Sequence, residues 1–356
     1  MAKIKELLVQ LSKNKASDLH IKVDNKPFIR VDGMIKQLTK YPVLANGDVD
    51  KLANELMSEK NKKRFKEHRE VDFAISANGE RFRLNIFTEK DHTSIVARHL
   101  TMQKRTFKDL NLPPVLEKFA DAPRGLVLVT GIAGSGKTTT ISAMIDWINN
   151  NKPANIITVE DPIEYIYEDR KSIIRQRELG ADTETYSKAL KHIVRQDPDV
   201  IFIGEIRDHE TMDSAMKATE LGNLVFSTLH TINATETVNR IIDLYPPHQQ
   251  GMARIILSSA LQAIVSLRLL PKKGGGRIPA VEVFYNTSTT KEYILDPKET
   301  YLIKKSIREG DYYGMQSFDQ SLVQLIKKGH IDVDTAKQTT ESQQDLQLAL
   351  KDENIL

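Results

Sequence analysis

The run GLVLVTGIAGSGKTTT at residues 125–140 constrains the fold more than any other part of this sequence. Apolar β-forming residues fill positions 126–129, and GIAGSGKT at 131–138 matches the pattern G-x-x-x-x-G-K-[ST]. In such a loop the glycines let the backbone turn tightly, so that successive N–H groups and the start of the next helix face one anion. The run therefore predicts a buried strand, a phosphate-binding loop and a helix, in that order.

The residues of this loop have distinct expected roles. Lys137 is expected to reach the β- and γ-phosphates of a nucleotide, and Thr138 is expected to hold Mg²⁺. ATP and Mg²⁺ are therefore the predicted cofactors. A glycine-rich turn without a ligand is disfavoured, because the loop follows an apolar strand and opens a helix. The full set of predicted phosphate-binding residues is Gly131, Gly134, Ser135, Gly136, Lys137, Thr138 and Thr139.

Beyond residue 124, apolar strands alternate with helices. Short apolar strands separated by helices are typical of a parallel sheet that is covered on both faces. The predicted fold class is therefore α/β, with a parallel-rich sheet. Beyond residue 246 we expect mostly helix, apart from the strand PAVEVF at 279–284, and we expect a solvated hairpin loop at 272–277. The predicted strands are 125–130, 156–160, 199–205 and 224–230, and the helices are 138–151, near 184–196 and near 209–221.

Carboxylates and a histidine follow these strands. Glu205 ends DVIFIGE, Glu160 and Glu164 lie in ITVEDPIE, and His230 ends LVFSTLH. Ligands of open α/β sheets bind at the carboxyl ends of the strands, so these side chains are expected near the P-loop. Glu205 is a predicted Mg²⁺ ligand, either Glu205 or Glu164 would orient the attacking water, and His230 would contact the γ-phosphate. Solvated loop acids and a structural histidine remain the alternatives.

The first hundred residues have the pattern of a small α+β domain. Ile4, Leu7, Leu8 and Leu11 have helical spacing, and a second helix is expected across 48–66, ending in the solvated basic run KNKKRFK. Strands are expected at 19–23, 28–31 and 93–100, with a turn at Asp32-Gly33 and a hairpin around Asn78-Gly79. The predicted division is a domain at 1–100, a linker at 101–112 and the P-loop domain at 113–356.

Composition narrows the class of protein. Hydrophobic residues make up 40% of the 356 residues and charged residues 28%, as in a soluble globular chain. There is no cysteine, which excludes disulfides and thiolate zinc sites. With a net charge of +3 and 6% aromatic residues, no nucleic acid is expected as a partner. No apolar run approaches the ~18 residues of a membrane span, and the charged start does not match a signal peptide.

Four segments of this chain resemble, in order, the Walker A, Asp, Walker B and His boxes of the secretion ATPases. They are GIAGSGKTTT, ITVEDPIE, RQDPDVIFIGEIRD and STLHTINA. ASDLHIKV at 16–23 and GMQSFDQSL at 314–322 are similar to the type IV pilus retraction branch, PilT and PilU. This resemblance implies a PAS-like N-terminal domain, a RecA-like motor domain with a helical C-terminal region, and a homo-hexamer. It implies a cytoplasmic ATPase, peripheral at the inner membrane, whose partner is the platform protein of the pilus machine.

The resemblance also assigns residues and leaves alternatives open. It places Arg83 and Arg98 at the phosphates, although solvated strand arginines are the alternative, and it makes Arg195 a weaker phosphate candidate. Where retraction ATPases carry AIRNLIRE, this chain has TTKEYILD at 289–296, and its tail at 335–351 is more similar to PilU. A helper motor that works with a second retraction ATPase therefore remains open. So do a RecA-type nucleic-acid translocase and an ATP-binding adaptor with little turnover.

Overall fold

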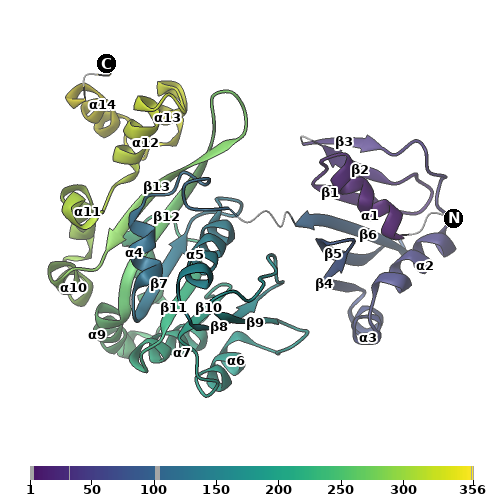
Figure 1. The fold of residues 1–356 in the computed structure, drawn as a ribbon, viewed down its shortest axis with the longest axis horizontal. Helices are drawn as coiled ribbons and strands as arrows, with labels where there is room; N and C mark the ends of the chain where they lie inside the picture. The colour runs from purple at the N-terminus through teal and green to yellow at the C-terminus, as the bar shows by residue number, and fades with distance from the viewer. Residues whose placement is uncertain (1–3, 32, 101–104, 354, 356) are drawn as a thin grey trace. The chain divides into compact units, whose positions relative to one another are not determined.

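The computed structural model describes residues 4–31, 33–100, 105–353 and 355, and these form two compact units (Figure 1). The first unit comprises Met1–Gln103 together with Pro162–Ile166. The second comprises Lys104–Asp161 and Tyr167–Leu356. The division at 103/104 falls inside the expected linker, of which residues 101–104 lie outside the described residues. The inclusion of Pro162–Ile166 in the first unit was not predicted.

The first unit is the expected α+β domain. Helix α1 (Ile4–Lys13) buries Leu7, Leu8 and Leu11 against an antiparallel sheet with the strand order β3-β2-β1-β6-β5-β4. Alternate residues of β5 face this core, so that Phe82 and Leu84 are buried while their neighbours lie on the other face. The strands are β1 Asp18–Ile21, β2 Phe28–Val31, β3 Met34–Gln37, β4 Glu70–Ala77, β5 Glu80–Glu89 and β6 His92–Leu100.

In the first unit, the predicted hairpin at Asn78-Gly79 is present, whereas the predicted helix at 48–66 is divided in two. Asn78 and Gly79 have φ of 53° and 77°, the left-handed conformations that a two-residue hairpin needs, which confirms the hairpin prediction. The expected single helix at 48–66 is wrong, because α2 (Asn46–Leu56) and α3 (Glu59–His68) are separate. Met57 has an extended backbone and ends α2, and Ser58 then begins α3 as its N-cap by accepting a hydrogen bond from the Asn61 backbone N–H. No residue of α3 is buried, and Asp32 of the expected turn lies outside the described residues.

The second unit is built on a seven-stranded sheet with the order β13-β12-β7-β11-β10-β8-β9. All neighbouring strands run parallel except β12 and β13. Strand β7 is buried on both faces, and its successive residues therefore pack into the two hydrophobic cores on opposite sides of the sheet. The strands are β7 Gly125–Thr130, β8 Asn155–Glu160, β9 Ile173–Glu178, β10 Val200–Ile203, β11 Leu224–Leu229, β12 Leu261–Pro271 and β13 Arg277–Tyr285.

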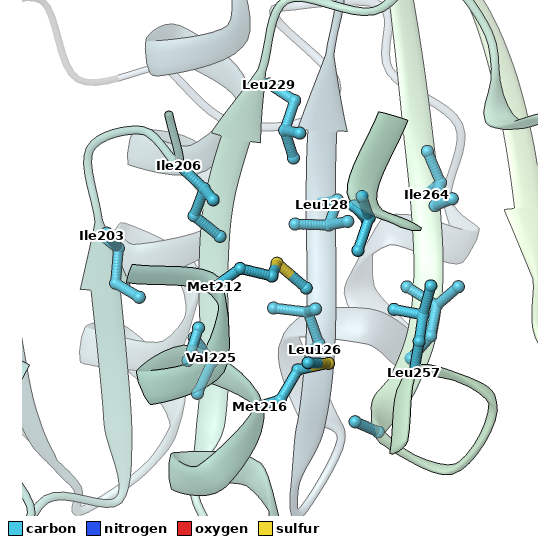
Figure 2. Packing of buried hydrophobic residues seen from close by; sticks show 14 of the residues in the cluster. Leu126, Leu128, Ile203, Ile206, Met212, Met216, Val225, Leu229, Leu257 and Ile264 are labelled. Carbon is cyan, nitrogen blue, oxygen red and sulfur yellow. The ribbon is translucent and has the colours of Figure 1, made fainter. Parts of the chain in front are cut away.

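Helices cover both faces of this sheet, which confirms the α/β prediction. Val127 and Val129 pack with α4 (Val115–Asp121) and α5 (Lys137–Asn151). Figure 2 shows the opposite core, where Leu126 and Leu128 meet Met212 and Met216. The helices of that side are α6 Tyr186–Ile193, α7 His209–Glu220, α8 Ala234–Asp243 and α9 Gln250–Ala260. The remaining helices are α10 Ser288–Leu295, α11 Ile303–Glu309, α12 Phe318–Lys327, α13 Val333–Thr339 and α14 Gln343–Asp352.

Two sequence expectations for this unit fail. Residues beyond 246 contain the eleven-residue strand β12, LQAIVSLRLLP, in a region that was expected to be helical apart from PAVEVF. The part of the expected linker at 105–112 belongs to the second unit's core, because Phe107 and Leu112 are buried there. The glycine-rich hairpin loop after β12 is confirmed. Within the described ranges, no helix has the length and apolar character needed to cross a membrane.

Candidate nucleotide-binding site

The loop between β7 and α5 has the backbone that its glycines predict. Gly131, Gly134 and Gly136 have φ of 141°, 77° and 101°, which residues with side chains rarely adopt. A Cβ at Gly131 would lie 2.5 Å from both the Leu267 carbonyl oxygen and Ser135 Oγ, so no larger residue fits. Because α5 begins at Lys137, its first turn and positive dipole end face the loop. The segment therefore has the form of a phosphate-binding loop.

Two side chains of the loop match a phosphate ligand. Lys137 Nζ donates hydrogen bonds to the carbonyl oxygens of Gly131, at 2.7 Å, and Ile132, at 3.1 Å, which holds the ammonium against the loop. The Ser135 hydroxyl is buried and, among the described residues, has no hydrogen-bond partner. Buried hydroxyls are normally hydrogen-bonded, so this one fits a ligand oxygen. The sequence predicted both residues as phosphate-binding.

A line of three functional groups connects the P-loop to two neighbouring strands. Lys137 Nζ lies 3.5 Å from His230 Nδ1, and His230 Nε2 lies 3.2 Å from Glu205 Oε2. An ammonium only donates hydrogen bonds, so Nδ1 of His230 accepts and its Nε2–H donates to the carboxylate. Glu205 also pairs with Arg207. The structure thus brings the three residues together at the carboxyl edge of the sheet, and their chemical roles stay predictions.

The local backbone fixes Glu205 and His230 beside each other. Glu205 follows β10, and the Thr228 hydroxyl donates to the Gly204 carbonyl at 2.7 Å. The Ile206 N–H donates to the Thr228 carbonyl at 3.1 Å, so the turn after β10 is tied to the end of β11, and His230 comes directly after β11. Burial, and then the nearby charges of Lys137 and Arg207, lower the pKa of His230 below its ordinary value of 6.5. His230 is therefore neutral at pH 7.

The site offers oxygen donors for Mg²⁺, but the described residues do not form a preformed set of three or more acidic or histidine ligands. Thr138 and Thr139 lie in the first turn of α5, and Glu205 is the nearby carboxylate in the line described above. No group of three or more acidic or histidine side chains gathers as a metal site in the part of the chain that the structure describes. Hard cations such as Mg²⁺ usually bind one or two protein oxygens together with nucleotide phosphates, and these residues fit that mode.

The structure separates two other predicted residues from the P-loop. Glu160 ends β8 at the same edge, but two strands lie between β8 and β7, and the buried carboxylate accepts hydrogen bonds from Thr158 at 2.7 Å and Gln176 at 3.2 Å. Arg195 precedes β10, in a turn whose next residue, Gln196, accepts a hydrogen bond from Asn155 at the start of β8. This is the amino-terminal edge of the sheet, opposite to the edge that carries the P-loop of this chain, and the role of Arg195 as a phosphate ligand stays a prediction.

Three predicted residues belong to the first unit. Arg83 on β5 and Arg98 on β6 are register partners, and Glu164 lies in Pro162–Ile166. Arg98 Nε lies 2.8 Å from Asp18 Oδ1, and Arg83 Nε lies 3.4 Å from Asp72 Oδ1. Burial acts to raise the pKa of Asp18, but the Ser17 hydrogen bond and Arg98 outweigh it and lower that pKa. That Arg83, Arg98 and Glu164 act on a nucleotide stays a prediction.

Sequence reasoning missed a buried polar chain behind the P-loop. Thr130, the last residue of β7, donates to Ser266 Oγ at 3.0 Å, and Ser266 Oγ lies 3.4 Å from Glu282 Oε1. All three side chains are buried. The available signal was a single acid inside the otherwise apolar strand PAVEVF, because a buried carboxyl group requires specific partners.

Comparisons with known proteins agree with this geometry. The family model described as "Type II/IV secretion system protein" matches residues 1–341. The "Type IV pilus retractation ATPase PilT" of Pseudomonas aeruginosa is 40% identical to this chain over 336 residues, which cover 94% of this chain and 97% of the relative. The "Type IV pilus ATPase PilU" of the same organism is 38% identical, over 97% of this chain and 91% of the relative.

A solved structure is similar over almost the whole chain. It is described as the pilus retraction motor PilT with bound ADP, and it aligns with a TM-score of 0.90 at 41% sequence identity. The alignment covers 98% of this chain and 100% of that one. The similarity therefore includes the P-loop, the strands beside it and the small first unit.

Proposed function

The chain belongs to the Type II/IV secretion system protein family and is a P-loop ATPase, and from this premise we propose that its ATP hydrolysis drives the retraction of type IV pili. The observation that carries the proposal is the line from Lys137 through His230 to Glu205 at the mouth of the P-loop. Similarity to PilT over nearly the whole chain connects this site with retraction.

Each residue of the site has a role in the proposal. The P-loop amides, Ser135 and Lys137 bind the ATP phosphates, and Thr138 with Glu205 holds Mg²⁺, which neutralises phosphate charge when bound. Glu205 orients the attacking water. His230 contacts the γ-phosphate and connects Lys137, which binds the phosphates, to the Glu205 carboxylate. Neutral His230 suits this position because a second cation beside Lys137 would be repelled.

The proposal also includes a mechanical part. Arg83 and Arg98 bind the γ-phosphate, so that ATP draws the N-terminal domain toward the nucleotide and loss of phosphate releases it. A homo-hexameric ring would convert these steps into motion at the platform protein of the pilus machine. The proposed location is the cytoplasmic side of the inner membrane, where that platform lies.

A second candidate, the helper motor, has its own support. The chain is 38% identical to PilU, and residues 289–296, where the sequence departs from the retraction motors, include most of α10. A helper would hydrolyse ATP but would need a second retraction ATPase. The nucleic-acid translocase has no comparable observation in its favour.

Deletion of the gene tests the proposal. The deleted strain should keep surface pili, often in excess, and lose twitching. The wild-type gene should restore twitching, whereas a Lys137→Ala copy expressed at the same level should not, because it cannot bind ATP phosphates. Cells that lose their pili altogether would identify an extension motor and contradict the proposal.

A further inference from the structure

A buried carboxyl group lies at the end of the polar chain behind the P-loop. Glu282 on β13 is only 7% exposed. Its Oε1 accepts a hydrogen bond from the Ala234 backbone N–H at 2.8 Å and lies 3.4 Å from Ser266 Oγ. Thr130 continues this chain by donating to Ser266 at 3.0 Å. One carboxyl group therefore connects three strands and the first residue of α8.

The two ends of this chain adjoin the site residues. Thr130 is the residue before Gly131, where the P-loop starts. Ala234 begins α8, four residues after His230. The P-loop and the His230 segment each contribute one member of the Lys137–His230 contact at 3.5 Å. The hydrogen bonds of Glu282 therefore reach both segments that form that contact.

Charged groups from several elements surround Glu282. Glu341 lies between α13 and α14, where it pairs with Arg268 of β12 and with Lys304 of α11 at 3.5 Å. Burial first, and then the Glu341 charge, raise the pKa of Glu282 to about 7, although the Ala234 hydrogen bond and Arg268 oppose this rise. Glu236 of α8 lines the same pocket as Glu282.

A pocket beside Glu282 gives solvent a path to this residue. The carboxyl group lines a pocket of about 360 Å³, together with Tyr301, Lys304 and Glu341. Arg268 lies over the ring of Phe318, 3.9 Å from the centroid, which keeps its charge in place at the side of this region. Glu282 therefore combines burial, a link to the active site and access to water.

We propose that Glu282 is a positioning residue, and that the loss of its proton tightens the link through Ser266 and Ala234 that aligns His230 with Lys137. A carboxylate accepts hydrogen bonds that are roughly twice as strong as those of a neutral acid. The ionised form therefore holds β7 and α8 together, and the protonated form loosens them. The inference rests on the ATPase activity of the proposed function and adds a residue that touches neither nucleotide nor metal.

The test is the pH dependence of ATP turnover between pH 5.5 and 9. In the wild type, kcat should rise through an inflection near pH 7. In Glu282→Gln that inflection should vanish, with kcat at pH 8.5 roughly three- to tenfold below the wild type and KM for ATP nearly unchanged. The exposed Glu292→Gln on α10 is the matched control and should behave as the wild type. Protonation of His230 occurs below pH 6.5 and should appear in every variant.

A second variant tests the same link without touching the acid. Ser266→Ala removes a hydrogen bond that favours the ionised carboxyl, so the inflection should move to higher pH. An inflection that persists in Glu282→Gln, or that does not move in Ser266→Ala, overturns the proposal. If the wild type hydrolysed no ATP, the proposed function would fail instead. The pH dependence of thermal unfolding of these variants would then still show whether Glu282 titrates near pH 7.

Discussion

Arg83 and Arg98 lie directly opposite each other on β5 and β6, so two guanidinium side chains share one face of the first unit's sheet. Like charges in directly opposed positions destabilise a sheet. Here the buried Asp18 carboxylate, 2.8 Å from Arg98, and Asp72, 3.4 Å from Arg83, offset that repulsion. The Arg98 side chain is 64% exposed despite its ion pair. The pair is therefore available for a strongly anionic ligand, as the arginines of a phosphoryl-transfer site must be.

Replacement of either arginine should slow catalysis more than it weakens binding. We expect Arg83→Ala and Arg98→Ala each to lower kcat by about tenfold or more, with a much smaller change in nucleotide affinity, because the P-loop stays intact. Steady-state ATPase assays and titration with a fluorescent ATP analogue measure the two quantities. The exposed Lys36→Ala on β3 is the control for loss of a surface charge in the same unit. Unchanged kcat in both arginine variants would contradict their assignment to the phosphates.

Substitutions of Lys137 and Glu205 should have different effects on nucleotide binding and turnover. Lys137→Ala removes the ammonium held against the loop carbonyls, so nucleotide binding and turnover should both be lost. Glu205→Gln keeps the shape of the side chain and removes the charge, so it should bind ATP while turnover falls ~10²-fold or more. Nucleotide titrations and single-turnover hydrolysis separate these effects. Glu205→Gln protein with near-normal turnover would show that another residue orients the water.

The buried Glu282 should make stability depend on pH in a defined direction. Its folded pKa of about 7 lies above its ordinary 4.5, so the folded state holds a proton that the unfolded chain has lost between these values. Stability is therefore fully present below pH 4.5 and falls as pH rises to about 7, by ~3 kcal/mol in total. Glu282→Gln removes this loss. Its melting temperature should exceed that of the wild type by an amount that grows from pH 5 to pH 8.

A constant difference in melting temperature across that range would mean that Glu282 does not titrate there. Glu292→Gln is again the control, because its carboxylate is exposed and its replacement should leave the pH profile unchanged. A gain in stability combined with slower turnover at high pH would fit a residue retained for function at the expense of stability.

The sequence predicted those parts of the site that depend on local pattern. The P-loop needs glycines with positive φ and a helix that starts at Lys137, and both features are visible in eight consecutive residues. Glu205 and His230 could be placed because parallel strands end at one edge. The place of Arg195 at the opposite edge was not visible, because its sequence distance from Glu205 does not reveal that strand β10 lies between the two residues.

Other features depend on tertiary contacts that no short pattern shows. Strand β12 contributes buried residues to the cores on both faces of the sheet, and this burial, which its mixed sequence LQAIVSLRLLP does not reveal, identifies it as a strand. The edge strand β9 was missed because most of its residues are polar and only partly buried. The buried chain from Thr130 to Glu282 joins residues more than a hundred positions apart, so only the fold reveals it.

Retraction under load should distinguish a principal motor from a helper. We expect a strain that lacks this gene to show no retraction of single pili at any load, because a principal motor supplies the whole stroke. Optical-trap measurements of pilus retraction give the force directly, and restoration of the wild-type gene is the control. A helper would produce a different result, in which retraction starts normally and stalls only at high load. That outcome would assign the principal stroke to a second ATPase, and the departure at residues 289–296 would then be the first segment to exchange between the two motors.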